Sequence, residues 1–410
     1  MAGRLKSAVP VTAESLQGFK YFDSLGALLK RLHTLGTERD KASNRELFYD
    51  QYVTLLLLYY FNPTLTSLRS LQAASSFAKV RKTLGVKRTS VSAMHEASVL
   101  FDPAPLRDII QELAAQAVQA QQKADSKRVS KTSHTLEGLK GLTAVDGTFL
   151  HALPRMFWAL CGNDKPAAKM HLHFDVLTGV PSDATVTAGS GGETEQLRLS
   201  LKPDRLYVTD RGYANYHLFR HILDAGSSFV ARVKSNVAFT VAKELTVTPA
   251  AREAGVTRDL VMDKLGTSHH VDAIQQPLRL VIVETTSPDG RPYTLYLVTD
   301  RLELSAEMVA QAYRYRWSIE LFFRWFKCVL GCRHPLAESI NGLTIQCYVG
   351  LIASLLIVVW TELRPCKRTW EMIQFYFQGW ASLEELEEHL TARRAKELKQ
   401  ALAAAGKARS

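Results

Sequence analysis

The chain has few cysteines and no apolar run long enough to cross a membrane. Its five cysteines are scattered, odd in number and without the paired spacing of a disulfide framework or a zinc site. The longest apolar runs, Val53–Phe61 and Val349–Trp360, are shorter than the roughly 20 residues that a spanning helix needs. We therefore expect two buried helices in a protein of a reducing, cytoplasmic compartment.

Also missing from the sequence are an internal repeat and, in the first 20 residues, the apolar segment of a secretory signal. What the sequence has instead is positive charge. The formal net charge is +11, and residues 1–140 hold 20 Lys and Arg against 12 Asp and Glu. This asymmetry favours a polyanionic partner, nucleic acid before membrane, although a chain that is merely basic would have the same composition.

Basic side chains crowd a helix-turn-helix-like pattern near residues 77–100. The first helix should end at Gly85, and the second should begin after Thr89 or Ser90 as its N-cap. Lys87 and Arg88 lie in the turn between them. The pattern favours DNA contact, although a helical bundle with a solvated basic face would share it. We predict a helical DNA-binding domain over residues 1–135, with a polar boundary at 121–141.

The next segment alternates between strand and helix patterns, and two of its strands carry an aspartate. Asp146 interrupts an apolar strand at 142–150, and Asp210 ends a strand at 205–210. A buried aspartate is costly unless it is paired or bound to a metal. The other expected elements are strands at 170–176, 180–188 and 229–233 and helices at 193–201 and 215–225.

This order of elements is that of a ribonuclease-H-like α/β fold with a mixed five-stranded sheet and flanking helices. In that topology the strands of Asp146 and Asp210 are central neighbours, so their carboxylates should converge. The expected divisions after the first domain are residues 136–233 (first part of the core), 234–300 (β-rich insertion), 301–345 (a helix that completes the core) and 346–410 (C-terminal helices).

One helix, predicted from Ser305 to Gly331, should present a third carboxylate. Tyr313, Arg316, Glu320 and Lys327 are spaced by 3, 4 and 7 residues. At about 100° per residue they fall within a stripe of roughly 60° on the helix. A surface helix with an ion pair between positions four apart would explain part of this spacing. The alternative is a stripe whose cations grip phosphates and whose phenol donates a hydrogen bond to one.

Together with Asp146 and Asp210, Glu320 would form a set of oxygen ligands that can hold two Mg²⁺ ions about 4 Å apart. Such a centre activates a water or a DNA 3′-hydroxyl and stabilises the leaving oxygen. The three residues are therefore both the catalytic and the metal-ligand candidates.

Three motifs then give the sequence a specific resemblance. They are Asp146-Gly-Thr, Asp210-Arg-Gly-Tyr, and the pattern Tyr-x2-Arg-x3-Glu-x6-Lys formed by Tyr313, Arg316, Glu320 and Lys327. On these residues the chain resembles a DDE transposase of the insertion-sequence-four type, over roughly residues 140–335. The resemblance implies a ribonuclease-H-like core and the same three carboxylates as ligands of two Mg²⁺ ions, with Mn²⁺ as an alternative ion.

The resemblance also implies an activity on double-stranded DNA. The expected enzyme cuts at the terminal inverted repeats of an insertion sequence, joins the 3′-hydroxyls to target DNA, and works as a homodimer in a synaptic complex. The expected DNA contacts are Tyr313, Arg316, Lys327, Arg211, Lys87 and Arg88. A ribonuclease-H-like nuclease that only hydrolyses DNA, and a catalytically silent DNA-binding derivative, remain alternatives.

Several other side chains could approach the site, and a plainer role is expected for each. Asp300 ends a segment, Val-Thr-Asp-Arg, that repeats the one around Asp210, and a turn or capping role is expected for it. The remaining candidates are Glu193, Glu195 and Asp175 as solvated charges, His171 and His173 as interior polar residues, and Trp317 and Trp325 as core residues or base-stacking platforms.

Overall fold

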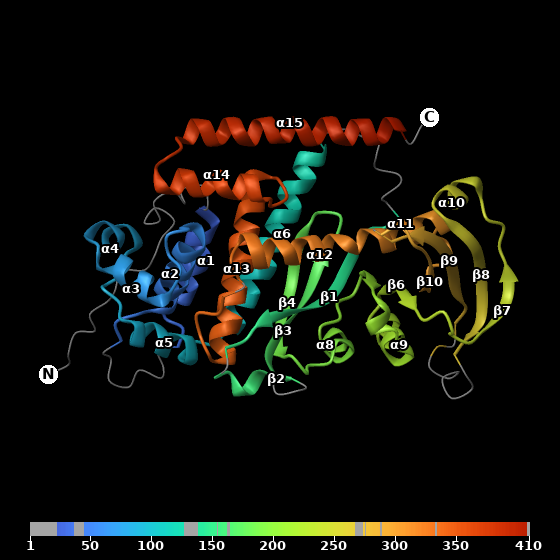
Figure 1. The fold of residues 1–410 in the computed structure, drawn as a ribbon, viewed down its shortest axis with the longest axis horizontal. Coiled ribbons are helices and arrows are strands. Elements are labelled where there is room, and N and C mark those ends of the chain that lie inside the picture. The colour runs from blue at the N-terminus through green and yellow to red at the C-terminus, as the bar shows by residue number, and fades with distance from the viewer. Residues whose placement is uncertain are drawn as a thin grey trace.

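The computed structural model describes residues 23–36, 45–126, 138–153, 155–161, 165–266, 274, 276–287, 289–332 and 334–407. A large sheet runs through the molecule, with helices α1–α5 gathered at one end and strands β7–β10 at the other (Figure 1). Most of the domain boundary predicted at 121–141 lies outside the described residues.

The N-terminal helices follow the predicted pattern closely. The helix α2 is almost entirely buried, including its polar residues Asp50, Gln51 and Thr54, and it ends before the predicted stop at Asn62-Pro63. Gly85 ends α4 with a left-handed φ of 62°, and the Ser90 side chain caps α5 by accepting a hydrogen bond from the Ala93 amide. The helices are α1 (Asp23–Leu32), α2 (Tyr49–Phe61), α3 (Leu68–Ser76), α4 (Ala78–Leu84), α5 (Val91–Leu100) and α6 (Ala104–Ser126).

The sheet has ten strands among the described residues, in the order β2-β3-β1-β5-β6-β10-β9-β8-β7, with β4 also paired to β3. The predicted five-stranded sheet was therefore too small. Antiparallel pairing between β10 and β6 joins the strands of the expected insertion to the same sheet. The strands are β1 (Leu142–His151), β2 (Leu160–Cys161), β3 (Lys165–Asp175), β4 (Val180–Ala188), β5 (Leu206–Thr209), β6 (Ser228–Val233), β7 (Phe239–Glu244), β8 (Val256–Leu265), β9 (Leu278–Thr286) and β10 (Pro292–Thr299).

Side chains alternate between two apolar cores on the two faces of the sheet. Ala144 of β1 belongs to the larger core, which also includes residues of α12 and α13, whereas Val145 faces the smaller core beneath α8 and α9. The helices after β1 are α8 (Glu193–Leu199), α9 (Tyr216–Asp224), α10 (Pro249–Glu253), α11 (Ala306–Tyr315), α12 (Trp317–Arg324), α13 (Ile340–Thr361), α14 (Lys367–Gln378) and α15 (Leu383–Lys407).

The central helix α13 contains the predicted apolar run Val349–Trp360 and crosses the boundary predicted at residue 345. Its 22 residues are long and apolar enough to cross a membrane, but 94% of its most apolar window is buried inside the protein. The larger core is a single cluster of contacting side chains, with members from Leu25 in α1 to Leu390 in α15. The packing therefore supports a buried core helix, as the sequence predicted.

The helix predicted from Ser305 to Gly331 is not uniform. The helix α11 ends at Tyr315, and at Arg316 the backbone tightens, because the Arg316 amide bonds to the Tyr313 carbonyl three residues back. After α12 the chain widens into a π-helical segment, Trp325–Val329, in which the Leu330 amide reaches the Trp325 carbonyl five residues back. The prediction of one regular α-helix with about 100° per residue over this stretch was thus wrong. Short π-helical segments such as this one are frequent at functional sites.

Candidate active site

Asp146, in the middle of β1, and Asp210, directly after the end of β5, lie side by side on two parallel strands. The strands β1 and β5 are paired with Leu142 beside Leu206 and Ala144 beside Val208. The same register, continued by two residues, places Asp146 beside Asp210. The predicted adjacency of these two strands is therefore confirmed.

Each of the two carboxylates accepts a hydrogen bond from the amide that follows it. The Gly147 amide lies 2.8 Å from Asp146 Oδ1, and the Arg211 amide lies 2.7 Å from Asp210 Oδ1. These bonds hold both carboxylates close to the backbone, and a carboxylate that accepts amide hydrogen bonds is favoured in its charged form.

Arg316 links Glu320 on α12 to Asp146 on β1, because its guanidinium contacts both carboxylates. The guanidinium of Arg316 lies 2.7 Å from Glu320 Oε1 through Nη2 and 3.5 Å from Asp146 Oδ2 through Nη1. Arg316 is buried, with 9% of its surface exposed. The tightened backbone at Arg316 thus points a cation at two carboxylates that are 174 positions apart in the sequence.

Asp210 has its own set of donors and cations. The Tyr313 hydroxyl donates a hydrogen bond to Asp210 Oδ1 over 3.1 Å. Arg232, from the adjacent strand β6, lies 3.6 Å from the same oxygen. The Arg316 guanidinium also lies over the Tyr313 ring, 5.7 Å from its centroid. The phenol and the guanidinium of the sequence motif therefore each contact one of the two strand aspartates.

The two strand aspartates differ in their affinity for a proton. Burial raises the pKa of Asp146 to about 6, against an opposing effect of Arg316, and nearby Glu193 and Glu320 add to the rise. Burial also acts on Asp210, but the Arg211 amide and the surrounding cations outweigh it and lower the pKa of Asp210. At neutral pH both are ionised, so both can offer oxygen ligands.

The other predicted DNA contacts lie at different places. The Lys327 ammonium donates to the Thr148 hydroxyl on β1 over 2.9 Å, two residues from Asp146. Arg211 is exposed beside Asp210. Lys87 and Arg88 are exposed in the turn between α4 and α5, at the end of the molecule where helices α1–α5 gather (Figure 1). The structure therefore brings the first two to the carboxylates and leaves the last two in another region.

Two more charged residues lie at the site: Glu193, which the sequence left as a possible neighbour, and Lys169, which it did not single out. Glu193, expected to be a solvated charge, forms an ion pair with the buried Lys169, their charged atoms 2.5 Å apart. Its carboxylate lies against Gly147 and Gly212, the glycines that follow the two strand aspartates. The only hint in the sequence was the placement of these two glycines.

The remaining candidates have ordinary structural roles. Both histidines are interior: His171 Nε2 bonds to the Thr187 hydroxyl and His173 Nε2 to the Ser200 hydroxyl, each over 2.9 Å. Burial lowers the pKa of each histidine to about 4, so both are neutral. The other outcomes are Trp325 in the core, Trp317 half exposed, Glu195 paired with Arg198, Asp175 hydrogen-bonded to Thr178, and Asp300 accepting from the Phe229 amide.

The carboxylates fit a divalent cation in kind, because oxygen donors suit Mg²⁺. As positioned, however, no three acidic, histidine or cysteine side chains of the described residues are gathered closely enough to hold an ion. The Arg316 guanidinium bridges two of the carboxylates instead. Buried polar atoms at the site also lack a hydrogen-bond partner within the described part of the chain, namely Arg316 Nε, Thr209 Oγ1 and Tyr213 OH. Such unpaired atoms are uncommon in folded proteins and are consistent with a site that binds a ligand.

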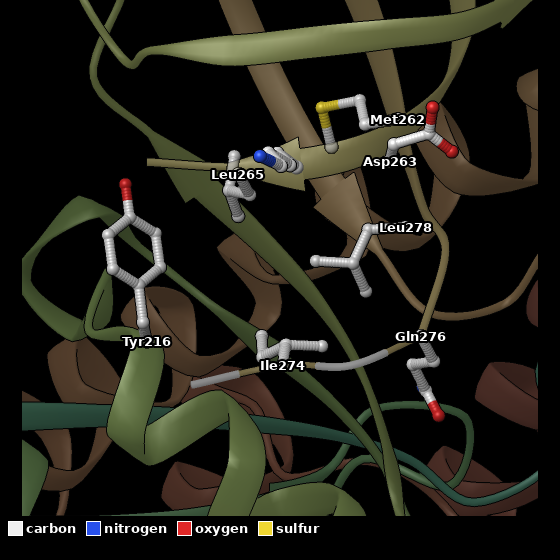
Figure 2. A pocket seen from close by; sticks show the side chains of 8 residues that line it. Tyr216, Met262, Asp263, Leu265, Ile274, Gln276 and Leu278 are labelled. Carbon is white, nitrogen blue, oxygen red and sulfur yellow. The ribbon is translucent and has the colours of Figure 1, made fainter. Parts of the chain in front are cut away.

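A small enclosed cavity lies elsewhere, between the start of α9 and the ends of β8 and β9 (Figure 2). Its volume is ≈ 10 Å³, about enough for one water molecule. Its lining includes Tyr216, Asp263 and Leu278 and none of the predicted site residues. The site at the strand ends is therefore not part of this cavity.

Comparison with known proteins identifies relatives of the chain. A protein of Sinorhizobium fredii named as a transposase is 27% identical over 226 residues, which are 54% of this chain and 61% of that protein. A protein of Geobacillus stearothermophilus named as a transposase for an insertion sequence element is 27% identical over 236 residues, 57% of this chain and 60% of that protein. A Synechocystis protein named in the same way is 22% identical over 313 residues, 75% of this chain and 80% of that protein. The chain thus aligns with less than two thirds of the first two relatives.

A solved structure titled as a piggyBac transposase synaptic complex with hairpin DNA matches 92% of this chain and 85% of its own, with a TM-score of 0.45 and 11% identity. The family model described as the transposase DDE domain matches residues 137–356, from just before β1 into α13. This match covers more than half of the chain and includes Asp146, Asp210 and Glu320. The chain therefore belongs to the family of transposases with a DDE domain.

Proposed function

We propose that the protein is a DNA transposase that cuts the ends of an insertion sequence and joins the resulting 3′-hydroxyls to target DNA. The observation that carries the proposal is the placement of three carboxylates around neighbouring strands. Asp146 and Asp210 lie side by side on the parallel strands β1 and β5, and Glu320 shares the Arg316 guanidinium with Asp146. Membership of the family and the transposase names of the relatives support the same activity.

Asp146, Asp210 and Glu320 would hold two Mg²⁺ ions, with Mn²⁺ as an alternative. Mg²⁺ bound there supplies the Lewis acidity that activates a hydroxyl nucleophile and stabilises the leaving oxygen of a phosphodiester. Until the metal binds, Arg316 partly neutralises Asp146 and Glu320, so that neither carboxylate is left buried and unpaired.

The remaining residues of the motif would act on the DNA backbone. Arg316 and Lys327 carry cations on the face of the carboxylates, and exposed Arg211 adds another beside Asp210. Guanidinium and ammonium groups bind phosphates through charge-assisted hydrogen bonds. Tyr313, which donates to Asp210 in the structure, would orient that carboxylate or donate to a phosphate.

The proposed fold is ribonuclease-H-like. The order β4-β3-β1-β5-β6, with β1, β5 and β6 parallel and β3 antiparallel to β1, supports it. The strands β7–β10 would be the insertion at 234–300 and α12 the helix that completes the core. The helices before residue 135 would bind the terminal inverted repeats, with Lys87 and Arg88 on phosphates, and a homodimer would hold two ends in a synaptic complex.

The test is a cleavage assay with Mg²⁺ and a duplex that carries the ends of the element encoding this chain. The proposal predicts nicking at the ends followed by joining of the 3′-ends to a target duplex, scored with hairpin products on a denaturing gel. Glu320→Gln is expected to abolish cleavage and keep DNA binding. Hydrolysis without joining would instead indicate a nuclease, and binding without cleavage would indicate a catalytically silent DNA-binding protein.

A further inference from the structure

Glu193 lies in a notch made by two glycines next to the catalytic aspartates. A Cβ atom added at Gly147 would lie 2.7 Å from Glu193 Oε1, and one added at Gly212 would lie 3.2 Å from Oε2. The Cβ at Gly147 would also lie 2.6 Å from Lys169 Cε, so a side chain at position 147 would push the ends of both Glu193 and Lys169 aside. The glycines at positions 147 and 212 therefore leave the space that the Glu193 carboxylate occupies, one or two residues after Asp146 and Asp210.

The partner of Glu193 is an unusual one. Lys169 is 9% exposed on β3, and its ammonium lies 2.5 Å from Glu193 Oε1 and 5.1 Å from the centroid of the Phe149 ring. Ion pairs that are largely removed from water are rarely worth their desolvation, and apolar residues of similar size often serve stability equally well. Fold stability alone thus gives little reason for this pair.

Unpaired polar atoms lie around the same pair. Tyr213 is 1% exposed, and its hydroxyl has no hydrogen-bond partner within the described residues. The nearby charges of Glu193 and Asp146 act on this phenol. The Nδ1 atom of His171, 4% exposed and opposite Gly147 on β3, likewise lacks a partner in the described part of the chain. Buried polar groups normally have partners, so these two atoms are free to bond to a ligand or to a water molecule that a ligand holds.

We propose that Glu193 is a fourth carboxylate of the metal centre, which helps to hold the divalent cation at Asp146, with Lys169 as its counter-ion in the ion-free protein. This inference rests on the proposed function, because it assumes that Asp146 binds a metal. The Tyr213 hydroxyl and His171 Nδ1 would bond to the water molecules that Mg²⁺ retains in proteins.

The test is a titration of the full chain with Mn²⁺ in the absence of DNA. The electron paramagnetic resonance signal of the free Mn²⁺ measures how much ion is bound. Glu193→Gln keeps the shape of the side chain and should weaken Mn²⁺ binding by roughly 10-fold or more, as loss of a supporting ligand commonly does. Lys169→Gln removes the competing cation and should tighten binding several-fold. The matched control is Glu195→Gln on the same helix, where the carboxylate is exposed and paired with Arg198, and binding should be unchanged.

The outcomes separate this inference from the proposed function. Asp146→Asn should lose Mn²⁺ binding if the metal centre exists at all. If Asp146→Asn loses binding while Glu193→Gln binds as tightly as the wild-type chain, Glu193 is only a partner for Lys169 and the inference is wrong. If Glu193→Gln fails to fold, Lys169→Gln decides: unchanged or weaker Mn²⁺ binding overturns the inference. If Asp146→Asn binds Mn²⁺ as tightly as the wild-type chain, the proposed metal centre at Asp146 does not exist.

Discussion

Two segments of this chain have nearly the same sequence but place their aspartates in different surroundings. Val-Thr-Asp-Arg ends β5 at Asp210 and ends β10 at Asp300. Asp210 lies in the candidate site, where Tyr313 and Arg232 contact it. Asp300 accepts a hydrogen bond from the Phe229 amide over 2.8 Å, at the start of β6.

The direction of the strand explains the difference. The strand β5 runs parallel to β1 and β6, so its C-terminal end lies beside Asp146. The strand β10 runs antiparallel to β6, with Thr299 beside Val230, so Asp300 lies near the N-terminal ends of β5 and β6 instead. Local sequence therefore does not separate Asp210 from Asp300, whereas the pairing of the strands places only Asp210 beside Asp146.

The largest expected difference between the two segments is in catalysis. Asp210→Asn removes a proposed metal ligand and should lower DNA cleavage by about 10³-fold or more, since such ligands supply several kcal/mol of transition-state stabilisation. Asp300→Asn should cleave within a few-fold of the wild-type chain. Both rates are measured on the same end-carrying duplex with Mg²⁺. Equal losses in the two variants would break the comparison.

Stability should show the reverse order. Asp300→Ala leaves the buried Phe229 amide without an acceptor and should cost about 1–3 kcal/mol of unfolding free energy. Asp210→Ala frees the Arg211 amide and the Tyr313 hydroxyl, but the Asp210 side chain is 40% exposed, so water can replace it for both donors and the cost should be smaller. Urea unfolding followed by circular dichroism measures both, and Asp300→Asn, which retains an acceptor, is the control. A larger loss for Asp210→Ala would contradict the structural role given to Asp300.

The two aspartates of the site should also respond oppositely to pH in the presence of a chelator. The folded chain ionises Asp146 near pH 6, whereas the unfolded chain does so near 3.8, so stability falls as pH rises between these values and the loss persists above them. Asp146→Asn removes this loss, and its unfolding free energy should gain on the order of 1–2 kcal/mol over the wild type across that window.

Asp210 has a lowered pKa, so its contribution to stability is fully present above about pH 4 and is lost as pH falls through the folded pKa. Asp210→Asn should therefore be less stable than the wild type at neutral pH and approach it in acid. Parallel pH profiles for the two variants would show that the aspartates do not occupy the different environments described above.

The smallest expected effect concerns the arginine that follows each aspartate. Arg211 is exposed beside the site, whereas Arg301 is paired with Glu303. Arg211→Ala should weaken DNA binding and reduce the slope of log affinity against log salt by about 1, as the loss of one phosphate contact does. Arg301→Ala should leave the slope unchanged. Fluorescence anisotropy over a range of salt concentrations compares the two, and a slope unaffected by Arg211→Ala would count against phosphate contact there.

The sequence predicted the elements that carry the site better than it predicted the site's detail. Strand order alone placed Asp146 beside Asp210, because apolar strands and capped helices have clear local patterns. The backbone changes around Arg316 and Trp325 were missed, because side-chain periodicity does not reveal where helical hydrogen bonds shift.

Long-range pairing was the other gap. The extension of the sheet from β6 to β10 depends on strands more than 60 residues apart, which no local pattern encodes. The approach of Glu193 to Gly147 could be seen only once β1 and α8 were placed together. The spacing of the motif at Tyr313, Arg316, Glu320 and Lys327, by contrast, was enough to predict that one helix supplies the third carboxylate.

The most direct measurement is an anomalous difference map from crystals of the chain bound to an element-end duplex in Mn²⁺. The account predicts Mn²⁺ peaks in direct contact with carboxylate oxygens of Asp146 and Asp210, with Glu320 in the same coordination shell and Arg316 moved away from Asp146. DNA-bound crystals whose duplex is cleaved, with Mn²⁺ bound away from all three carboxylates, would contradict it.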